Sequence, residues 1–63
     1  MRIIRKTEIE HRTGYTERTL RDLEAAGSFP RRFLINPAGR SVGWLEYEVD
    51  VWIEQRAASR VVA

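Results

Sequence analysis

The side chains of this sequence with the clearest chemical potential are its arginines. Ten of the 11 basic residues are arginine, against 9 acidic residues, and the formal net charge is +2. A guanidinium group donates two parallel hydrogen bonds, a geometry that suits phosphate groups and the edges of bases. Coding DNA rich in G and C also raises the arginine content, so position is more informative than number. Residues 1–32 hold 8 basic and 5 acidic groups and residues 33–63 hold 3 and 4, so the positive charge lies in the first half.

The sequence offers little for catalysis or metal binding. It has no cysteine, and its only histidine, His11, has no nucleophile beside it in a recognisable motif. The acidic residues between positions 46 and 54 follow the pattern of a solvated helix face rather than of paired acids in a cleft. A domain of this size is also expected to have difficulty forming a pocket of ordinary ligand volume, roughly 300 Å³ or more. We therefore expect no catalytic residues, no cofactor, no metal site and no small-molecule ligand.

Helices and strands have to position the arginines, and the first predicted element is a short helix. Thr7 and Glu10 have the spacing of a capping box, which predicts a helix over residues 8–13. Gly14 is expected to end that helix, because glycine readily takes the left-handed conformation.

A second helix is predicted over residues 17–26, with Thr16 as its N-cap and Gly27 at its end. Leu20 and Leu23 have helical spacing and are expected to face inward, across the first helix. Two short helices joined by a three-residue turn that contains glycine are typical of a helix-turn-helix.

The second half of the chain predicts a β-hairpin and a third helix. Residues 31–44 combine alternating side chains with the turn sequence Asn-Pro-Ala-Gly, as in a hairpin. An apolar stripe predicts a helix over residues 45–58. Tyr15 is expected to wedge between the first two helices, and four other aromatic residues are expected to form most of the core under the hairpin. These four are Phe29, Phe33, Trp44 and Trp52.

The order of these elements predicts a mostly α fold with a small β-hairpin, a winged helix-turn-helix in which the hairpin is the wing. The length predicts a single domain over residues 1–63, and a composition of 43 % hydrophobic and 32 % charged residues is that of a globular chain. The apolar runs are too short to cross a membrane, and the N-terminus lacks the apolar region of a signal peptide. We expect a cytoplasmic protein.

Two segments resemble a known family, namely TEIEHRTGYTERTLRDLEAAGSFPRR and VGWLEYEVDVWIEQR. They look like the AlpA-like prophage regulators, which are related to phage excisionases and to the MerR-type winged-helix domain. The resemblance covers about residues 4–56, and its most specific part combines Phe29-Pro30, Gly43-Trp44 and the helix with Val49 and Trp52. It implies a non-enzymatic protein that binds DNA and either switches transcription or directs the excision of a mobile element.

The candidate DNA contacts follow from the helix-turn-helix. The N-terminal half of the second helix enters the major groove in such proteins, so Arg18 and Arg21 are our candidates for reading bases. Thr16 with the helix N-terminus can hold a phosphate, and Glu17 can accept a hydrogen bond from a cytosine amino group. Basic residues near positions 2–6 are a further source of charge. The full set of candidates is Thr16, Glu17, Arg18, Thr19, Arg21, Arg31, Arg32 and Arg40.

An alternative reading remains open: a protein–protein interaction module on the same fold that has lost DNA binding. The pairs Glu17–Arg21 and Arg18–Asp22 can equally stabilise a solvated helix, and the second helix carries more acid than base. Exposed apolar residues at Leu34, Tyr47 and Val51 would then form a patch for self-association, although isolated exposed apolar residues are normal. On DNA, we expect cooperative binding with further copies, or a recombinase as partner.

Overall fold

The computed structural model describes residues 2–60 and 62. The elements follow the expected order, with one additional strand at the N-terminus. They are β1 (Ile3–Ile4), α1 (Lys6–Thr13), α2 (Glu17–Ala25), β2 (Phe33–Leu34), β3 (Val42–Leu45) and α3 (Glu46–Ala58). The chain is mostly helical with a small antiparallel sheet, which confirms the predicted fold class and is consistent with a winged helix-turn-helix.

The first helix begins earlier than predicted, and the predicted capping box is wrong. The N-cap of α1 is Arg5, whose extended backbone continues β1 and whose carbonyl accepts the first helical hydrogen bond, from Ile9 at 3.0 Å. Thr7 therefore lies inside the helix. The Glu10 carboxylate accepts instead from the backbone N–H of Glu17, at 3.1 Å, and so caps the first turn of the next helix.

The turn between the two helices matches the sequence pattern closely. Gly14 takes the left-handed conformation with φ of +74°, and its N–H bonds to the carbonyl of Glu10. Thr16 is the N-cap of α2, and its hydroxyl accepts from the N–H of Thr19. The second helix ends at Ala25, one residue before the predicted end.

The sheet is larger than predicted because the N-terminus joins it. Its strand order is β1-β3-β2, with Ile4 opposite Trp44 and Phe33 opposite Gly43. The backbone N–H of Glu46 bonds to the carbonyl of Arg2 at 2.9 Å, so β1 also caps the start of α3. The expected hairpin is present, but its paired first strand is only two residues long.

The core lies where α1, α2 and α3 meet the sheet. Its buried members are Ile4, Ile9, Leu20, Phe29, Trp44 and Val49, with Leu23, Trp52 and Ile53 packed against them. Two expectations are wrong. Phe33 is 37 % exposed because it lies on an edge strand at the start of the hairpin, and Tyr15 is 41 % exposed. Tyr15 packs the edge of its ring on Trp52 of α3 instead of wedging between the first two helices.

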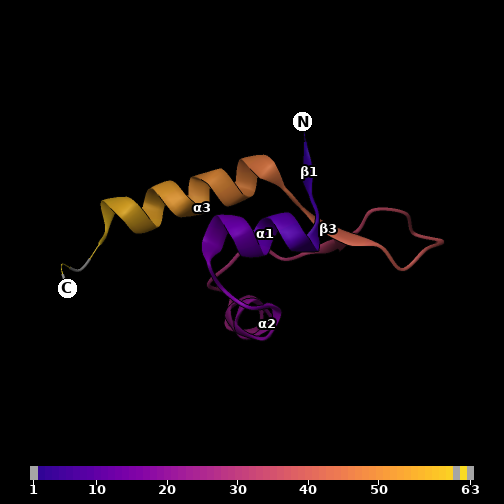
Figure 1. Ribbon diagram of the computed structural model, residues 1–63, viewed down its shortest axis with the longest axis horizontal. Coiled ribbons are helices and arrows are strands. Elements are labelled where there is room, and N and C mark those ends of the chain that lie inside the picture. Colours follow the sequence, from indigo (N-terminus) through magenta and orange to yellow (C-terminus); the bar gives the residue numbers. More distant parts are fainter. Residues whose placement is uncertain (1, 61, 63) are drawn as a thin grey trace.

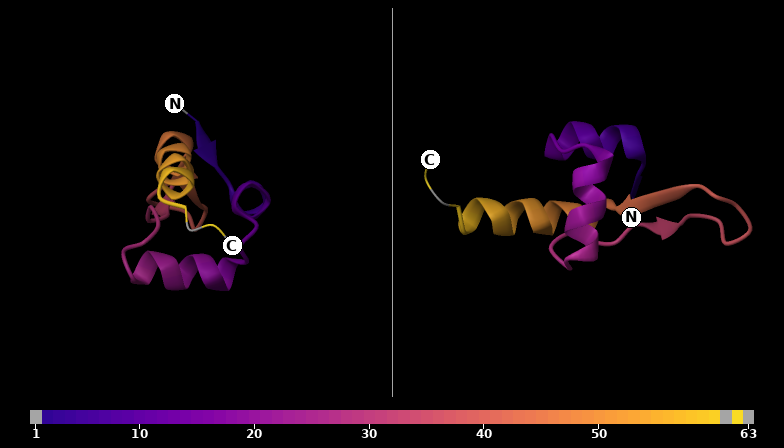
Figure 2. Two further views of the ribbon diagram at one scale, coloured as in Figure 1. Left: turned by 90° about the vertical axis from the view of Figure 1, so that its left-hand side faces the viewer. Right: turned by 90° about the horizontal axis from the view of Figure 1, so that it is seen from below.

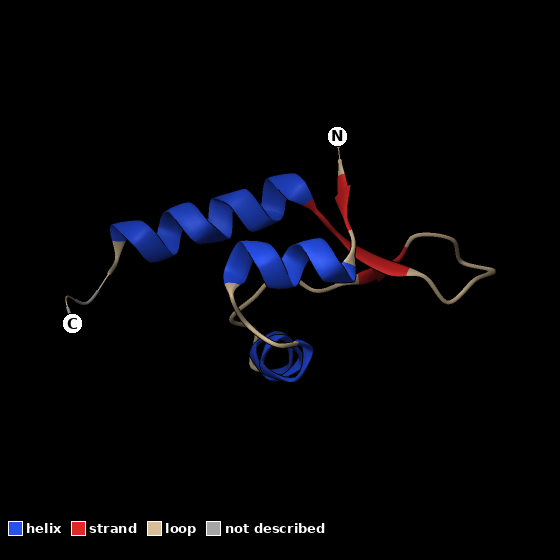
Figure 3. Cartoon of the chain, viewed as in Figure 1, coloured by secondary structure: helices blue, strands red, loops and turns tan. Residues whose placement is uncertain are grey.

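The helices and the hairpin point in different directions. The helix α3 extends to one end of the molecule and the loop between β2 and β3 extends to the other, along a long axis of 44 Å (Figure 1, Figure 3). The helix α2 is seen end-on in Figure 1 and runs across the long axis in Figure 2, on the outer side of the molecule. One side of α2 is therefore free of other elements.

Candidate nucleic-acid interface

The outer face of α2 carries two exposed arginines. Leu20 is fully buried and Leu23 is half-buried, so Arg18 and Arg21 lie on the opposite side and are exposed. Arg18 makes no side-chain hydrogen bond or ion pair with any residue that the structure describes. Arg21 is 68 % exposed and pairs with Glu17 one turn earlier, at 3.2 Å. At the start of the helix, the hydroxyls of Thr16 and Thr19 lie 3.2 Å apart.

The Glu17 carboxylate forms ion pairs with three cations from different parts of the chain. Its carboxylate lies 2.8 Å from Lys6 of α1, 3.2 Å from Arg21 of α2 and 3.1 Å from Arg32, which precedes β2. Hydrogen bonds from Lys6, then Arg21 and Arg32, lower the pKa of Glu17 to about 2. The Glu17 carboxylate is thus engaged in ion pairs within the protein. From the sequence we expected it to contact a cytosine amino group, and the sequence did not indicate its pairs with Lys6 and Arg32.

Arg32 turns inward, unlike the other candidate arginines. Its side chain is only 14 % exposed and forms a forked pair with Glu24 of α2, with the closest contact at 2.9 Å. Its guanidinium also lies over the ring of Trp44, 4.9 Å from the centroid. The hydrogen bonds that Arg32 donates to the Glu24 carboxylate raise the pKa of Arg32. No residue pattern predicts this pairing, since Arg32 follows Glu24 by eight positions and a turn of the chain lies between them.

The other two hairpin arginines remain at the surface. Arg31 and Arg40 are exposed, and neither has a side-chain hydrogen bond or ion pair within residues 2–60. Arg40 lies at the end of the loop between β2 and β3, whose turn is fixed by Asn36: its side-chain oxygen accepts from the N–H of Ala38 and its carbonyl from that of Gly39. The hairpin thus presents the positive charges of Arg31 and Arg40 to solvent.

A second ion-pair network fastens the N-terminus and α1 to α3. Arg2 contacts Glu8 at 2.6 Å and Glu46 at 2.8 Å, and Arg12 contacts Glu46 at 2.6 Å and Asp50 at 3.0 Å. Hydrogen bonds from Arg2 lower the pKa of both Glu8 and Glu46. These two arginines pair with acidic side chains of the protein itself at its surface, so Arg2 adds little to a phosphate-binding surface.

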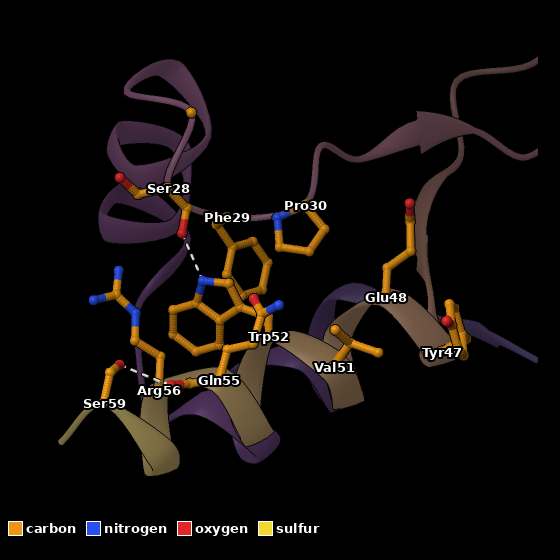
Figure 4. A pocket seen from close by; sticks show the side chains of 11 residues that line it. Ser28, Phe29, Pro30, Tyr47, Glu48, Val51, Trp52, Gln55, Arg56 and Ser59 are labelled. Carbon is orange, nitrogen blue, oxygen red and sulfur yellow. Dashed lines mark hydrogen bonds between the residues drawn. The ribbon is translucent and has the colours of Figure 1, made fainter.

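An open groove lies between α3 and the segment that follows α2 (Figure 4). Its volume is about 590 Å³, so this small domain forms a hollow of ligand size, as a groove open to solvent and not as an enclosed pocket. The indole N–H of Trp52 donates to the carbonyl of Ser28, and the Phe29 ring packs edge-on against Trp52 with centroids 4.8 Å apart. Tyr47, which is 72 % exposed, lies at one end, and Val51 lies on the floor. Leu34, the third residue of the expected patch, does not line the groove.

Residues 2–60 were compared with the requirements of two other kinds of site, a metal centre and a membrane span, and fit neither. No cluster of histidine and acidic residues in this part of the chain has the makings of a metal site. None of the described helices is sufficiently long and apolar to traverse a bilayer.

Comparison with known proteins gives one family. A family model described as "Prophage CP4-57 regulatory protein (AlpA)" matches residues 2–57, which is most of the chain and includes both helices of the helix-turn-helix, the hairpin and most of α3. No curated protein matches the sequence.

Proposed function

The chain belongs to the AlpA family of prophage regulatory proteins, a DNA-binding family, and from this we propose how it binds DNA. We infer that α2 enters the major groove of double-stranded DNA and that the hairpin, as a wing, lies along the sugar-phosphate backbone. The protein then acts in the cytoplasm as a single domain over residues 1–63, without a cofactor and without catalysis. Its wing corresponds to that of a MerR-like winged helix-turn-helix.

The observation that carries this proposal is the unobstructed outer face of α2. Arg18 and Arg21 are exposed there, one turn apart, and bidentate arginine to guanine is the commonest specific base contact. Arg21 keeps 68 % of its side chain exposed beside its pair with Glu17, so its guanidinium is accessible from the outer face of α2. At the helix start, the hydroxyls of Thr16 and Thr19 suit hydrogen bonds to a phosphate.

The wing supplies the remaining contacts. Arg31 and Arg40 are exposed and separated from α2, so they suit phosphates on either side of the groove that α2 enters. Together with Arg18 and Arg21, these two residues make about four charged contacts with DNA. The logarithm of the association constant is therefore expected to fall with the logarithm of the salt concentration at a slope of about −4. We leave Arg32 out of the proposed DNA contacts, because its charge is matched by Glu24 and Glu17.

A binding titration tests the proposal. The protein is titrated with the region upstream of its own coding sequence and with a random duplex of equal length, at two salt concentrations. We expect Arg40→Ala to weaken binding to both duplexes and to reduce the salt slope by about one, and Arg18→Ala to reduce the preference between them. Arg60→Ala is the matched control: it removes the same charge, at the far end of α3, and should leave the slope unchanged. Absence of binding to either duplex at low salt would contradict the proposal.

Two biological roles remain compatible with this mode of binding, transcriptional regulation and excision of a mobile element. One helix and one wing read about one half-site, so either role requires several copies on repeated or inverted sites. An excisionase bends its DNA, at a cost that depends on the sequence bent. The length of the footprint and the bend angle distinguish the two roles.

The groove beside α3 favours a second candidate, an interaction module that works through a protein partner. It offers an aromatic floor with Phe29 and Trp52 and the highly exposed Tyr47 at its edge. If the titration shows no DNA binding, this face is where a partner, a recombinase or a second copy, should be sought. Tyr47→Ala would then abolish the association.

A further inference from the structure

We propose that Glu24 and Arg32 are positioning residues, which fix the wing relative to the recognition helix α2 so that both reach DNA together. This inference rests on the proposed DNA binding for its purpose. The arrangement itself is a property of the free protein, and it can be measured without DNA.

The Glu24 carboxylate accepts hydrogen bonds from both the backbone and the side chain of Arg32. One carboxylate oxygen accepts from the backbone N–H of Arg32 and from its Nε, each at 3.1 Å, and the other lies 2.9 Å from the terminal guanidinium nitrogen Nη2. The Glu24 side chain is 11 % exposed, so water competes weakly for these bonds. The chain is therefore fixed at the residue where the hairpin begins.

The same guanidinium also reaches the start of α2 and the second hairpin strand. Its Nη1 nitrogen lies 3.1 Å from Glu17, which is seven residues before Glu24 and so about two turns earlier in the helix. The single guanidinium of Arg32 therefore binds side chains from two separate turns of α2. The other contact is Trp44 of β3, whose ring centroid lies 4.9 Å from the Arg32 Cζ atom, within the range of a cation–π interaction.

Besides Arg32, the hydrophobic core joins these two parts of the molecule, since Leu20 of α2 and Trp44 of β3 belong to one buried cluster. The backbone of α2 does not pack closely on either strand of the hairpin over the described residues, whereas β3 packs on β1, β2 and α3. Side chains between α2 and the hairpin therefore determine their relative position. Among these side chains, that of Arg32 contacts both α2 and the hairpin. Its planar guanidinium suits the forked pair with a carboxylate.

Two variants test the inference while keeping the side chains close to their original size. Glu24→Gln removes one charge, and Arg32→Lys keeps the charge but has no fork to span Glu17 and Glu24. Arg12→Ala is the control, because it breaks an ion-pair network that joins α1 to α3 and involves neither α2 nor the hairpin. Circular dichroism establishes that each variant is folded.

The first readout is the position of the wing in the free protein. Since the chain has no cysteine, Ala25→Cys on α2 and Ser41→Cys beside β3 can carry a single pair of spin labels. We expect the distribution of distances between the labels to become at least twice as broad in Glu24→Gln and in Arg32→Lys, and to stay narrow in Arg12→Ala. If both variants are folded and keep the original distribution, the inference is overturned.

The second readout is the contribution of the wing to DNA binding, measured with a random-sequence duplex at 0.1 M salt. Arg40→Ala removes about one phosphate contact and should weaken binding about 5- to 10-fold in the unsubstituted protein. In the Arg32→Lys background the same change should cost less than about twofold, because the wing no longer reaches the backbone. An equal loss in both backgrounds would refute the positioning role. If the unsubstituted protein does not bind the duplex, the proposed function fails, and the label distances alone decide the inference.

Discussion

The substitution Gly43→Ala tests whether the N-terminal strand is an integral part of the fold. Gly43 lies on the central strand β3, and a Cβ atom there would lie 2.7 Å from Cγ2 of Ile3 and 2.9 Å from the backbone carbonyl oxygen of Ile4. The end of the Ile35 side chain would be 3.2 Å away. Side chains can rotate, but the carbonyl oxygen moves only with its strand. We therefore expect β1 to shift by roughly 0.5 Å or to detach.

The size of the effect has limits that follow from the structure. Overpacking of this kind typically costs about 1–3 kcal/mol. If β1 detached completely, the fully buried Ile4 would become exposed, which costs about 1.5–3 kcal/mol. We expect a loss of about 2 kcal/mol in the free energy of unfolding. A chain of this length has on the order of 3–9 kcal/mol in total, and the melting temperature should fall by about 8–16 °C.

Urea denaturation followed by tryptophan fluorescence measures this loss. Gly39→Ala is the matched control, because its Cβ would lie no closer than 3.6 Å to any neighbour, an ordinary contact, and its backbone has no positive φ. The control should change stability by less than about 0.5 kcal/mol. If Gly43→Ala is as stable as the control, the close approach of β1 to β3, and the sheet built on it, are refuted.

Three further predictions follow from the contacts around α2. Arg32→Ala leaves the Glu24 carboxylate, 11 % exposed, without its cation and should lower the free energy of unfolding by about 3 kcal/mol, measured by urea denaturation; a change below about 0.5 kcal/mol would contradict the inward placement. The pKa of Glu17 is lowered from 4.5 to about 2, so its ionised form stabilises the fold above about pH 4.5 and this contribution is lost as the pH falls toward 2. Acid titration should accordingly show a smaller loss of stability between pH 5 and 2 for Glu17→Gln than for the unsubstituted protein. Identical slopes of stability against pH would argue against the three-cation cluster. Thr16→Ala removes the cap of α2 and should cost about 1 kcal/mol in thermal unfolding, whereas no loss would mean that the threonine hydroxyl does not cap the helix.

The elements that the sequence predicted well are those stabilised by neighbours along the chain. The N-cap at Thr16, the left-handed Gly14 and the leucine spacing of α2 each act within a turn or two of helix, so their residue types reveal them. The outward placement of Arg18 and Arg21 follows from the same spacing, because a helix buries one face and exposes the other. The fold class and the family resemblance were therefore readable from the sequence.

Contacts between distant segments were not readable, and they decide which of the candidate arginines face solvent. A strand of two residues has no periodicity of its own, so β1 is defined only by its pairing with β3. Arg31 and Arg32 are adjacent and chemically identical, yet one is exposed and the other lies between Glu24 and Trp44. The sequence by itself determined the helices and the charge available to bind DNA. Only the tertiary structure decided how that charge is divided between internal ion pairs and the surface, because ion pairs depend on distances in space that chain spacing does not set.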